Sequence, residues 1–527
     1  MINTENFYSS YYKDTTKDKA LPTASRIRFE NGVVENVLLE DKEFTDAFRS
    51  SVQVLPFTSN PSTSNYDRSC GLRGITGEFF RKSKDRQTKA ISDFENNAIQ
   101  PVRNYLLQQK HMKEKQVEEF IEIMKDVMYS DGSLTIIDPS FLKFLPLTDG
   151  NTNSKKYEHG QRSIAEYLSS MLCPKDLLVD MLSKKPNLFN EIIISALSSS
   201  TGTGGSNENE YIILPFIKEA FGEDLKWFLK RDDSIVVKYI HVFLHFYLCY
   251  SLSQTLVYLD YRKYNIVPEK PQKMYYILTS EHASEGREAV TNGWNKYVNK
   301  EALEKSFGRI EALDILNSLL DGNIGFYNDV YNKLKEQDFN DEIKMLLEDV
   351  ICSYQRDKRE QLKKREVAKF QFPDEVSTEV NSYDDFILKL GLLCTTLQSK
   401  EYESKMKIRV NNIMKIRMLS TRRGREILNL DDEMLFFLMA MISKGTRMKL
   451  EDLYEGFGKY GVAFDYDTKA AIENYLLKLN LLERKSDSGE AQYVKIVLYI
   501  SRGKTNHRLF HNTQAWFIWI KIFLCSV

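Results

Sequence analysis

Two sets of charged residues have the spacing found in metal-dependent nucleases. In this pattern an acidic residue is followed later in the chain by a second acid, one further residue and a lysine. The sets are Asp385, Glu403 and Lys405, and Asp465, Glu483 and Lys485. Nuclease carboxylates hold divalent metal ions and usually come from neighbouring strands. The first set begins in an expected helix, and the second straddles an expected helix and hairpin. We therefore assign no catalytic residue, and a metal-dependent nuclease remains an alternative.

A second possible site contains His241, His245 and Cys249, which are spaced four residues apart. This spacing places the three side chains on one face of a helix, where they could hold zinc. The surrounding sequence is apolar on nearly every side of that helix, and no fourth ligand is evident. Val242 also occupies the position at which a zinc protease would have Glu. The pattern predicts core residues and no metal.

The chain has no recognisable sequence signature for nucleotide hydrolysis or for a catalytic serine. Gly204 and Gly205 are followed by Ser206, Asn207 and Glu208, whereas a phosphate-binding loop needs Lys and then Ser or Thr after its last glycine. The serine motif GxSxG does not occur either. We therefore expect no ATP binding, no cofactor and no catalytic activity by this chain alone.

The segment Lys405–Arg425 is strongly basic and contains no acidic residue, although the chain as a whole has a net charge of −1. Its basic residues are Lys405, Lys407, Arg409, Lys415, Arg417, Arg422, Arg423 and Arg425. Apolar residues alternate with these charges, so the segment is expected to stay attached to a core. A phosphate backbone is the natural complement of such a segment, and we predict that it contacts DNA. An ordinary basic surface is the alternative.

The residues after this segment have the order of helices and strands of a winged helix. One helix is expected to begin at Asp431, a short second helix covers Leu450–Phe457, and a third begins at Asp467 or Thr468. Two strands joined by a turn are then expected within Leu481–Leu498. Three helices followed by such a β-wing predict a winged-helix module.

The third helix of a winged helix usually enters the major groove of DNA, so its exposed side chains are candidate contacts. These side chains are Lys469, Asn474 and Lys478, with Glu473 beside them. Acidic residues on this helix and on the expected wing would repel phosphates. Docking to another protein is therefore the alternative use of the module.

Two further segments have the composition of partner-binding surfaces. In Tyr275–Trp294, polar residues follow a short apolar run, and Glu281, Arg287 and Trp294 are the candidate contacts. Alternatively, Glu281 and Arg287 pair locally and Trp294 anchors the next helix. The charged block Gln355–Glu366 follows a helix that we expect to leave the core near Tyr354. Its candidate contacts are Lys363, Lys364 and Arg365, and a solvated helix face is the alternative.

Length and composition predict a multidomain, mainly α protein. The chain has 527 residues, and at roughly 150 residues per domain it should form about three units. We expect a mixed region at 1–83, helical domains at 84–400 with a loop at 198–210, the basic segment and winged helix at 401–498, and an appended tail at 499–527.

The expected location of the protein is the cytoplasm. The chain has six cysteines but no CxxC motif, so it encodes neither a disulfide framework nor a zinc ribbon. Its first residues lack an apolar core of signal-peptide length, so secretion is not expected. The most apolar stretch, Tyr239–Leu259, is interrupted by polar residues and is expected to be a buried helix rather than a membrane span.

Three parts of the chain together resemble the DNA phosphorothioation-dependent restriction protein family DptG, also called DndG. They are the run LNLLERKSDSGEAQYVK at Leu479–Lys495, the segment YYILTSEHASEGREAVTNGWNKY at Tyr275–Tyr297 and the helical middle. The resemblance covers roughly residues 131–498 and carries over no functional residue. It implies a subunit of a bacterial anti-phage restriction complex that attacks DNA lacking phosphorothioate. The implied partners are DNA, an ATPase subunit and a helicase-like subunit. A winged-helix DNA-binding regulator remains an alternative.

Overall fold

The computed structural model describes most of the chain between residues 53 and 495, together with short N-terminal pieces. The described residues are 2–4, 6–8, 12–14, 27–30, 33–36, 42–44, 53–56, 72–84, 91, 93–108, 113–130, 133–134, 138–145, 155–172, 188–198, 211–298, 300–320, 324–365, 372–398, 400–484 and 492–495. This part is mainly helical, as predicted. The expected tail at 499–527 and the loop residues 199–210 lie outside the described residues.

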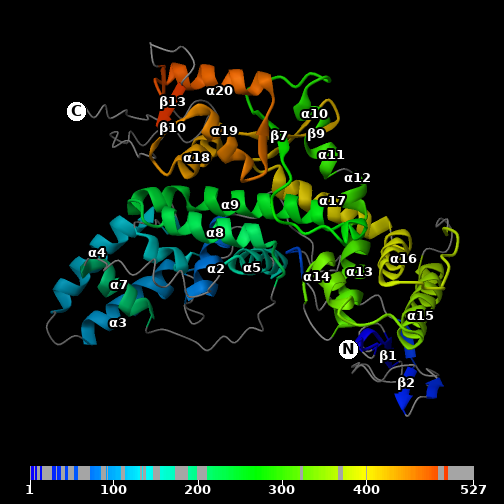
Figure 1. Cartoon of the computed structure of the whole chain (residues 1–527). Helices are drawn as coiled ribbons and strands as arrows, with labels where there is room; N and C mark the ends of the chain where they lie inside the picture. The colour runs from blue at the N-terminus through cyan, green and yellow to red at the C-terminus, as the bar shows by residue number, and fades with distance from the viewer. Residues whose placement is uncertain are drawn as a thin grey trace.

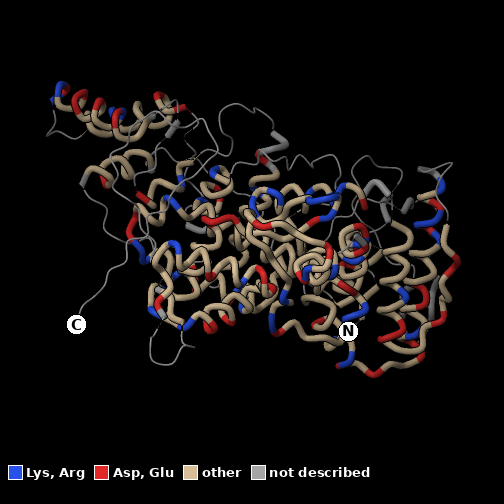
Figure 2. The backbone as a smooth tube through the Cα atoms, turned by 90° about the horizontal axis from the view of Figure 1, so that it is seen from above, with Lys and Arg blue, Asp and Glu red and all other residues tan. Residues whose placement is uncertain are grey.

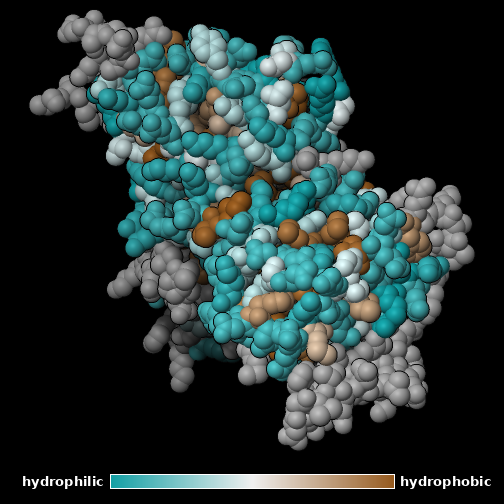
Figure 3. Space-filling model, turned by 45° about the vertical axis from the view of Figure 1, so that its right-hand side comes forward, coloured by the Kyte–Doolittle hydropathy of each residue, from teal (hydrophilic) through white to brown (hydrophobic). Residues whose placement is uncertain are grey.

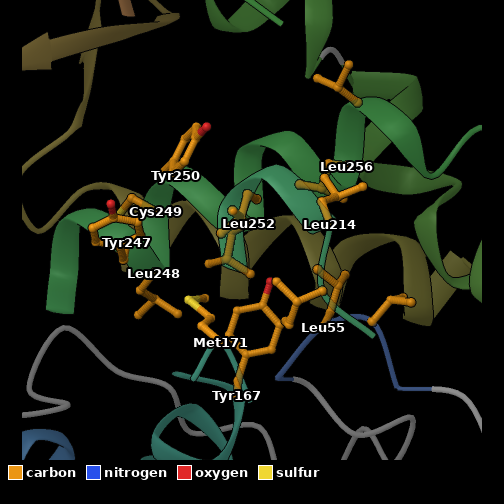
Figure 4. Close-up of a cluster of buried hydrophobic side chains, with 14 of the residues drawn as sticks. Leu55, Tyr167, Met171, Leu214, Tyr247, Leu248, Cys249, Tyr250, Leu252 and Leu256 are labelled. Carbon is orange, nitrogen blue, oxygen red and sulfur yellow. The ribbon is translucent and has the colours of Figure 1, made fainter. Parts of the chain in front are cut away.

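The centre of the molecule is the long helix α9, Asp233–Tyr258 (Figure 1). It is long and apolar enough to cross a membrane, but 83% of its most apolar window is buried inside the molecule. Helix α8, Pro215–Phe228, and helix α5, Lys155–Ser169, pack against it. Figure 4 shows α5 extending Tyr167 toward α9, where its hydroxyl lies 2.6 Å from that of Ser251. The prediction of a buried core helix is confirmed.

A smaller hydrophobic core lies in the N-terminal half of the chain. It is formed by α3, Gln100–Gln108, α4, Glu114–Met128, and α7, Leu188–Ser198, which gather at one end of the molecule in Figure 1. The buried residues of α4 include Val117 and Ile121, which are spaced four residues apart. This spacing follows the helical periodicity of the sequence, which places one apolar face toward the core.

Helices of the chain's middle form the opposite end of the molecule. They are α12 (Lys300–Glu304), α13 (Ser306–Ser318), α14 (Tyr327–Leu334), α15 (Asp341–Arg365), α16 (Tyr383–Thr396) and α17 (Lys400–Met414). Helix α15 was expected to leave the core near Tyr354, but Lys358 and Leu362 are still buried. The helix stays packed for two further turns because the Lys358 ammonium pairs with the buried Glu311 carboxylate at 3.2 Å.

The C-terminal part of the chain packs above α9 (Figure 1). Its elements are β8 (Leu419–Arg422), β9 (Arg425–Leu430), α18 (Asp432–Ser443), β10 (Arg447–Lys449), α19 (Leu450–Gly458), β11 (Val462–Phe464), α20 (Tyr466–Lys478), β12 (Leu482–Arg484) and β13 (Gln492–Lys495). Strands β10, β13 and β12 form one antiparallel sheet, in that order.

A second sheet joins this part of the chain to the middle of the sequence. Its strand order is β11-β7-β9-β8, where β7 is Met274–Leu278. Strand β7 is parallel to both β11 and β9, whereas β8 and β9 form an antiparallel hairpin. The C-terminal part is therefore built into the helical body through strand pairing and is not attached by a flexible linker.

The remaining elements are short, apart from the 13-residue helix α2. They are β1 (Tyr12–Asp14), β2 (Ile27–Glu30), β3 (Val33–Asn36), β4 (Lys42–Phe44), α2 (Leu72–Lys84), η2 (Glu95–Ile99), β5 (Tyr129–Ser130), β6 (Ser133–Leu134), η3 (Pro139–Phe144), η4 (Tyr261–Lys263), α10 (Glu288–Thr291) and α11 (Trp294–Tyr297). The N-terminus contacts the helical body, because the amide of Asn3 donates to the carbonyl oxygen of Leu319 at 2.8 Å.

Candidate docking and nucleic-acid interface

Three parallel strands end at the same edge of the mixed sheet, and the residues that follow them are polar. Strand β7 leads into the loop Thr279–Arg287, which we call the polar loop. Strand β9 leads to Asp431, whose carboxylate accepts from the Met434 amide at 2.7 Å and caps α18. Strand β11 leads to Asp465, which caps α20 through the Thr468 amide at 2.9 Å. The sheet thus brings the polar loop together with the starts of α18 and α20.

Arg287 is the centre of a buried hydrogen-bond network at this edge. Its Nε and Nη2 atoms donate to the Asp465 carboxylate at 2.9 and 2.6 Å, and Nη2 also donates to the Thr468 hydroxyl at 2.7 Å. The Glu281 carboxylate lies 3.4 Å from Nη2 and accepts from the Thr468 hydroxyl at 3.0 Å. The side chains of Arg287 and Asp465 are only 8% and 6% exposed. This network fastens the start of α20 to the polar loop.

The ionisation of the network follows from these contacts. Burial alone would raise the pKa of Asp465, but the hydrogen bonds from Arg287 and Thr468 outweigh it and lower the pKa below its usual value. The hydrogen bond to Asp465 is the main cause of the raised pKa of Arg287, against desolvation. Both groups are therefore charged at neutral pH.

The predicted partner-binding residues of this segment lie inside the molecule. Arg287 is 9% exposed and Trp294 is 1% exposed, so a partner does not reach either side chain in this conformation. Local pairing of Glu281 with Arg287, which the sequence also allowed, is the arrangement observed. Arg287 and Trp294 therefore hold the fold together, and the exposed residues of the polar loop, such as His282 and Glu285, are what a partner could contact.

The basic segment Lys405–Arg425 is divided between a helix and the β8–β9 hairpin. Lys405, Lys407 and Arg409 lie on α17, where Lys405 and Lys407 are half-buried. Arg409 is 2% exposed, which corrects its expected contact with DNA. The side chain of Arg409 packs in the interior because the apolar face of α17 surrounds its position, with Met406 and Val410 buried on either side.

Acidic residues from just outside the basic segment neutralise two of the charges that follow α17. The Lys415 ammonium lies 2.9 Å from the Glu426 carboxylate, and Arg417 lies 2.6 Å from the Glu433 carboxylate. Arg422 donates to the carbonyl oxygens of Thr279, at 2.9 Å, and of Glu281. These contacts place the basic segment beside the polar loop, a proximity that the sequence did not indicate.

The turn between β8 and β9 leaves two arginines at the surface. Arg423 and Gly424 form a two-residue loop in which both φ angles are positive, at 49° and 76°. Arg423 and Arg425 are exposed, and Arg425 has a weak ion pair with the exposed Glu285 at 3.5 Å. The backbone conformation of Arg423 is one that Gly or Asn adopts more readily. An Arg-Gly pair between two strand signals was the available sequence clue to this turn.

Helix α20 exposes the residues that the sequence predicted. Lys469, Asn474 and Lys478 all lie at the surface, and Glu473 is half-buried beside them. Lys469 rests over the ring of Tyr454, with its ammonium 5.2 Å from the ring centroid. Tyr466, in the first turn, is 85% exposed, which makes it the most exposed large hydrophobic side chain described. Sequence reasoning missed Tyr466, because no local pattern distinguishes an exposed aromatic from a core one.

The residues that follow the basic segment are not basic overall. From Asp431 to Arg484 the chain has ten Asp and Glu residues against seven Lys and Arg residues. Figure 2 shows Lys and Arg interspersed with Asp and Glu over the described backbone. Helix α20 itself has two acidic and two basic residues, so it offers no net positive charge to a phosphate backbone.

The third predicted contact surface is the last turn of α15. Lys363 is exposed, and its ammonium lies 5.8 Å from the centroid of the Phe372 ring. Arg359, one turn earlier, donates to the Pro373 carbonyl oxygen at 2.7 Å. Lys364 and Arg365 are the final residues of the helix. A partner contact here stays a prediction.

The two nuclease-like sets are not assembled. Asp385 pairs with Lys389 at 2.8 Å, while Glu403 pairs with Lys305 at 2.7 Å. In the second set, Asp465 holds Arg287, and the Glu483 carboxylate lies 2.6 Å from Arg447; Lys485 lies outside the described residues. Within the described ranges, no group of three His, Cys, Asp or Glu side chains is placed to hold a metal ion.

His245 is a core residue, as predicted. It is fully buried, its Nε2 atom lies 3.1 Å from the Ile413 carbonyl oxygen, and the Cys249 sulfur lies 3.5 Å from the same nitrogen. Burial lowers the pKa of His245 to about 4, so its imidazole is neutral at physiological pH. His241 is half-buried on the same helix, and burial lowers its pKa as well.

A buried carboxylate that the sequence did not single out ties α8 to the C-terminal part. Asp224 is 3% exposed, and it accepts hydrogen bonds from the hydroxyls of Tyr247 and Tyr460, each at 2.6 Å. Lys444, which follows α18, also pairs with this carboxylate. Asp224 therefore provides a second fixed connection, after Arg287, between the helical body and the C-terminal part.

Comparison with protein-family models and with curated proteins finds no match to this chain.

Proposed function

We propose that the chain is a non-catalytic bridging subunit of a bacterial anti-phage restriction complex that acts on DNA lacking phosphorothioate. Its proposed partners are DNA, an ATPase subunit and a helicase-like subunit. The resemblance of Tyr275–Tyr297 and Leu479–Lys495 to the DptG family is the reason for this choice of complex. The observation that carries the bridging role is the arrangement of the C-terminal unit, Asp431–Lys495.

The C-terminal unit is proposed to be a winged-helix module. Its elements follow in the order α18, β10, α19, α20, β12 and β13, with the short strand β11 before α20. The first strand of the unit pairs with the last, since Met448 lies opposite Val494, and β13 then pairs with β12 through Val494 and Leu482. A three-stranded sheet of this order beside three helices supports the proposal. The turn at Asp487–Glu490 lies outside the described residues.

Protein docking is the use of this module that its charges favour. An acidic excess over the module disfavours phosphate, whereas the exposed Tyr466 is the kind of residue that anchors protein interfaces. Most of the surface seen in Figure 3 is hydrophilic, with small apolar patches, so a large obligate apolar interface is not evident on that face. A modest interface centred on α20 fits these features.

The rigid attachment of the module supports bridging over a free DNA-binding arm. The contacts that hold it to the helical body include the β7–β11 pairing, the Arg287–Asp465 ion pair and the Lys444–Asp224 ion pair. A module held in this way presents α20 at a fixed orientation relative to the rest of the chain. A bridging subunit needs that property in order to place two partners relative to each other.

Co-purification tests the proposal. The full chain should be retained by the ATPase and helicase-like subunits of the proposed complex, and Tyr466→Ala combined with Lys478→Glu should reduce that retention. Lys115→Glu on α4, whose side chain is 88% exposed, is the matched control and should change nothing. Failure of the wild-type chain to retain either protein would refute the proposal, and equal retention by the α20 variant would refute the assigned surface.

A further inference from the structure

The β8–β9 hairpin has an unusual residue at its turn. Arg422 pairs directly with Arg425, so Arg423 and Gly424 alone connect the strands. Positive φ at both positions is the geometry of a type I′ turn, in which Asn-Gly or Asp-Gly is favoured. An arginine at the first position is disfavoured there because its Cβ crowds the backbone. A local conformational cost of this kind marks a position where the side chain has a use.

The arginines at this turn are available to a ligand. Within the described part of the chain, Arg423 has no hydrogen bond or ion pair, and its side chain is exposed. Arg425 is 48% exposed, and its ion pair with the 75% exposed Glu285 is of the solvated kind that contributes little to stability. A Cβ atom built on Gly424 would meet nothing within 4 Å, so the end of the hairpin projects into open space.

The rest of the hairpin is held in place. Arg422 donates to the carbonyl oxygens of Thr279 and Glu281 in the polar loop. Glu426 pairs with Lys415 at 2.9 Å, and its carbonyl oxygen accepts from the Asn295 amide at 2.9 Å. Arg423 and Arg425 are therefore presented by a fixed β-ribbon, which lowers the entropy lost when they bind.

We propose that the hairpin turn, Arg422–Arg425, is the surface of this chain that contacts the phosphate backbone of duplex DNA. Arg423 and Arg425 make the contacts, and Arg422 is a positioning residue. This inference rests on the proposed function and names the element that binds DNA. The hairpin turn takes the role that the sequence had suggested for α20 and for the whole basic segment. Guanidinium groups bind phosphate oxygens in a bidentate way, and a narrow ribbon can approach a groove.

The composition of the turn favours nucleic acid over an acidic protein. Its exposed residues are Arg423, Gly424 and Arg425, with the exposed Thr421 just before it, so it offers no aromatic or aliphatic anchor. Protein interfaces depend on such anchors at their centre. Contacts limited to phosphates carry no base information, so the binding should be weak, dependent on salt and indifferent to sequence.

The test measures the affinity of the full chain for a short duplex at several salt concentrations. Arg423→Gly combined with Arg425→Gln should weaken binding and reduce the slope of log K against log salt by about 1.8, since each phosphate contact contributes about 0.9. Lys469→Gln combined with Lys478→Gln removes the same charge from α20 and is the matched control. It should leave the slope unchanged. The melting temperature of the hairpin variant should be kept, because glycine suits the turn better than arginine.

Three results would overturn the inference. The first is an unchanged slope in the hairpin variant, and the second is an equal loss in the α20 control, which would mean that diffuse charge is responsible. The third is binding of polyglutamate as tightly as duplex DNA, which would indicate an acidic protein partner. Co-purification with the ATPase and helicase-like proteins is scored in the same variants. If the wild-type chain does not co-purify with these proteins, the bridging function is refuted. The dependence of DNA affinity on salt decides the role of the hairpin separately.

Discussion

Replacing Arg287 should destabilise the protein strongly, because its loss would leave two buried carboxylates without their partner. Arg287→Met keeps a similar side-chain length and removes the charge. The side chains of Asp465 and Glu281 are 6% and 11% exposed, so water does not replace the lost contacts. Breaking a buried ion pair from one side costs about 3–5 kcal/mol, and we expect a loss of unfolding free energy in that range.

The pairing can be isolated by a double-mutant cycle measured by chemical denaturation. Asp465→Asn keeps a residue that caps α20 well but removes the charge that Arg287 pairs with. The cost of the double variant should be smaller than the sum of the two single costs by at least about 1 kcal/mol, since the residues are in direct contact. Additive costs, or a loss below about 1 kcal/mol for Arg287→Met, would refute the assigned network.

The same pair predicts a pH dependence. The folded-state pKa of Asp465 is lowered, so its stabilising effect is complete above the unfolded pKa of about 3.9 and is lost as the pH falls through the lower folded value. The difference in unfolding free energy between the wild type and Asp465→Asn should therefore shrink as the pH is lowered below about 4. A difference that stays constant from pH 7 to pH 3 would show that the carboxylate is not held in its charged form.

Further predictions concern His245, the buried Asp224 and the activity of the purified chain. Because burial lowers the pKa of His245 to about 4, the protein should lose about 3 kcal/mol of unfolding free energy as the pH falls from about 6.5 to 4. His245→Gln should abolish this contribution to acid denaturation. Elemental analysis of the wild type should find no stoichiometric zinc, iron or manganese. Tyr460→Phe removes one donor from the buried Asp224 and should cost about 1.5–3 kcal/mol, a loss that thermal unfolding would detect. The purified chain should show neither ATPase nor nuclease activity, and magnesium-dependent DNA cleavage abolished by Asp385→Ala would support the nuclease alternative.

Local patterns predicted the elements of this protein better than their assembly. The cap at Asp431 depends on a few neighbouring residues, and the structure has the helix that was expected to begin there. The i, i+4 spacing of Val117 and Ile121 is equally local, and both residues lie on the buried face of α4. Strand β11, by contrast, lies in a short apolar run between two helices and pairs with β7, whose residues are far away in the chain. No periodicity within either segment specifies that pairing.

The basic segment shows that the number of charges in a stretch of sequence does not indicate which of them are free to contact DNA. The window Lys405–Arg425 contains no acid, but Glu426 and Glu433 follow it closely and neutralise Lys415 and Arg417. Arg409 is buried because its position on α17 faces the core. Helix and strand geometry decide which charges meet, so among the basic residues of this segment only Arg423 and Arg425 are exposed.

The polar loop connects the two surfaces to which we assign binding. The Glu281 carboxylate lies beside Arg287 and Thr468 at the start of α20, and the Glu281 carbonyl oxygen accepts from Arg422 of the hairpin. A shift of this residue would therefore move both α20 and the hairpin turn. If α20 docks a protein and the hairpin contacts DNA, then a movement of Glu281 is the most direct described way in which binding at one surface could change binding at the other. That coupling would be carried by side-chain and backbone contacts of a single residue.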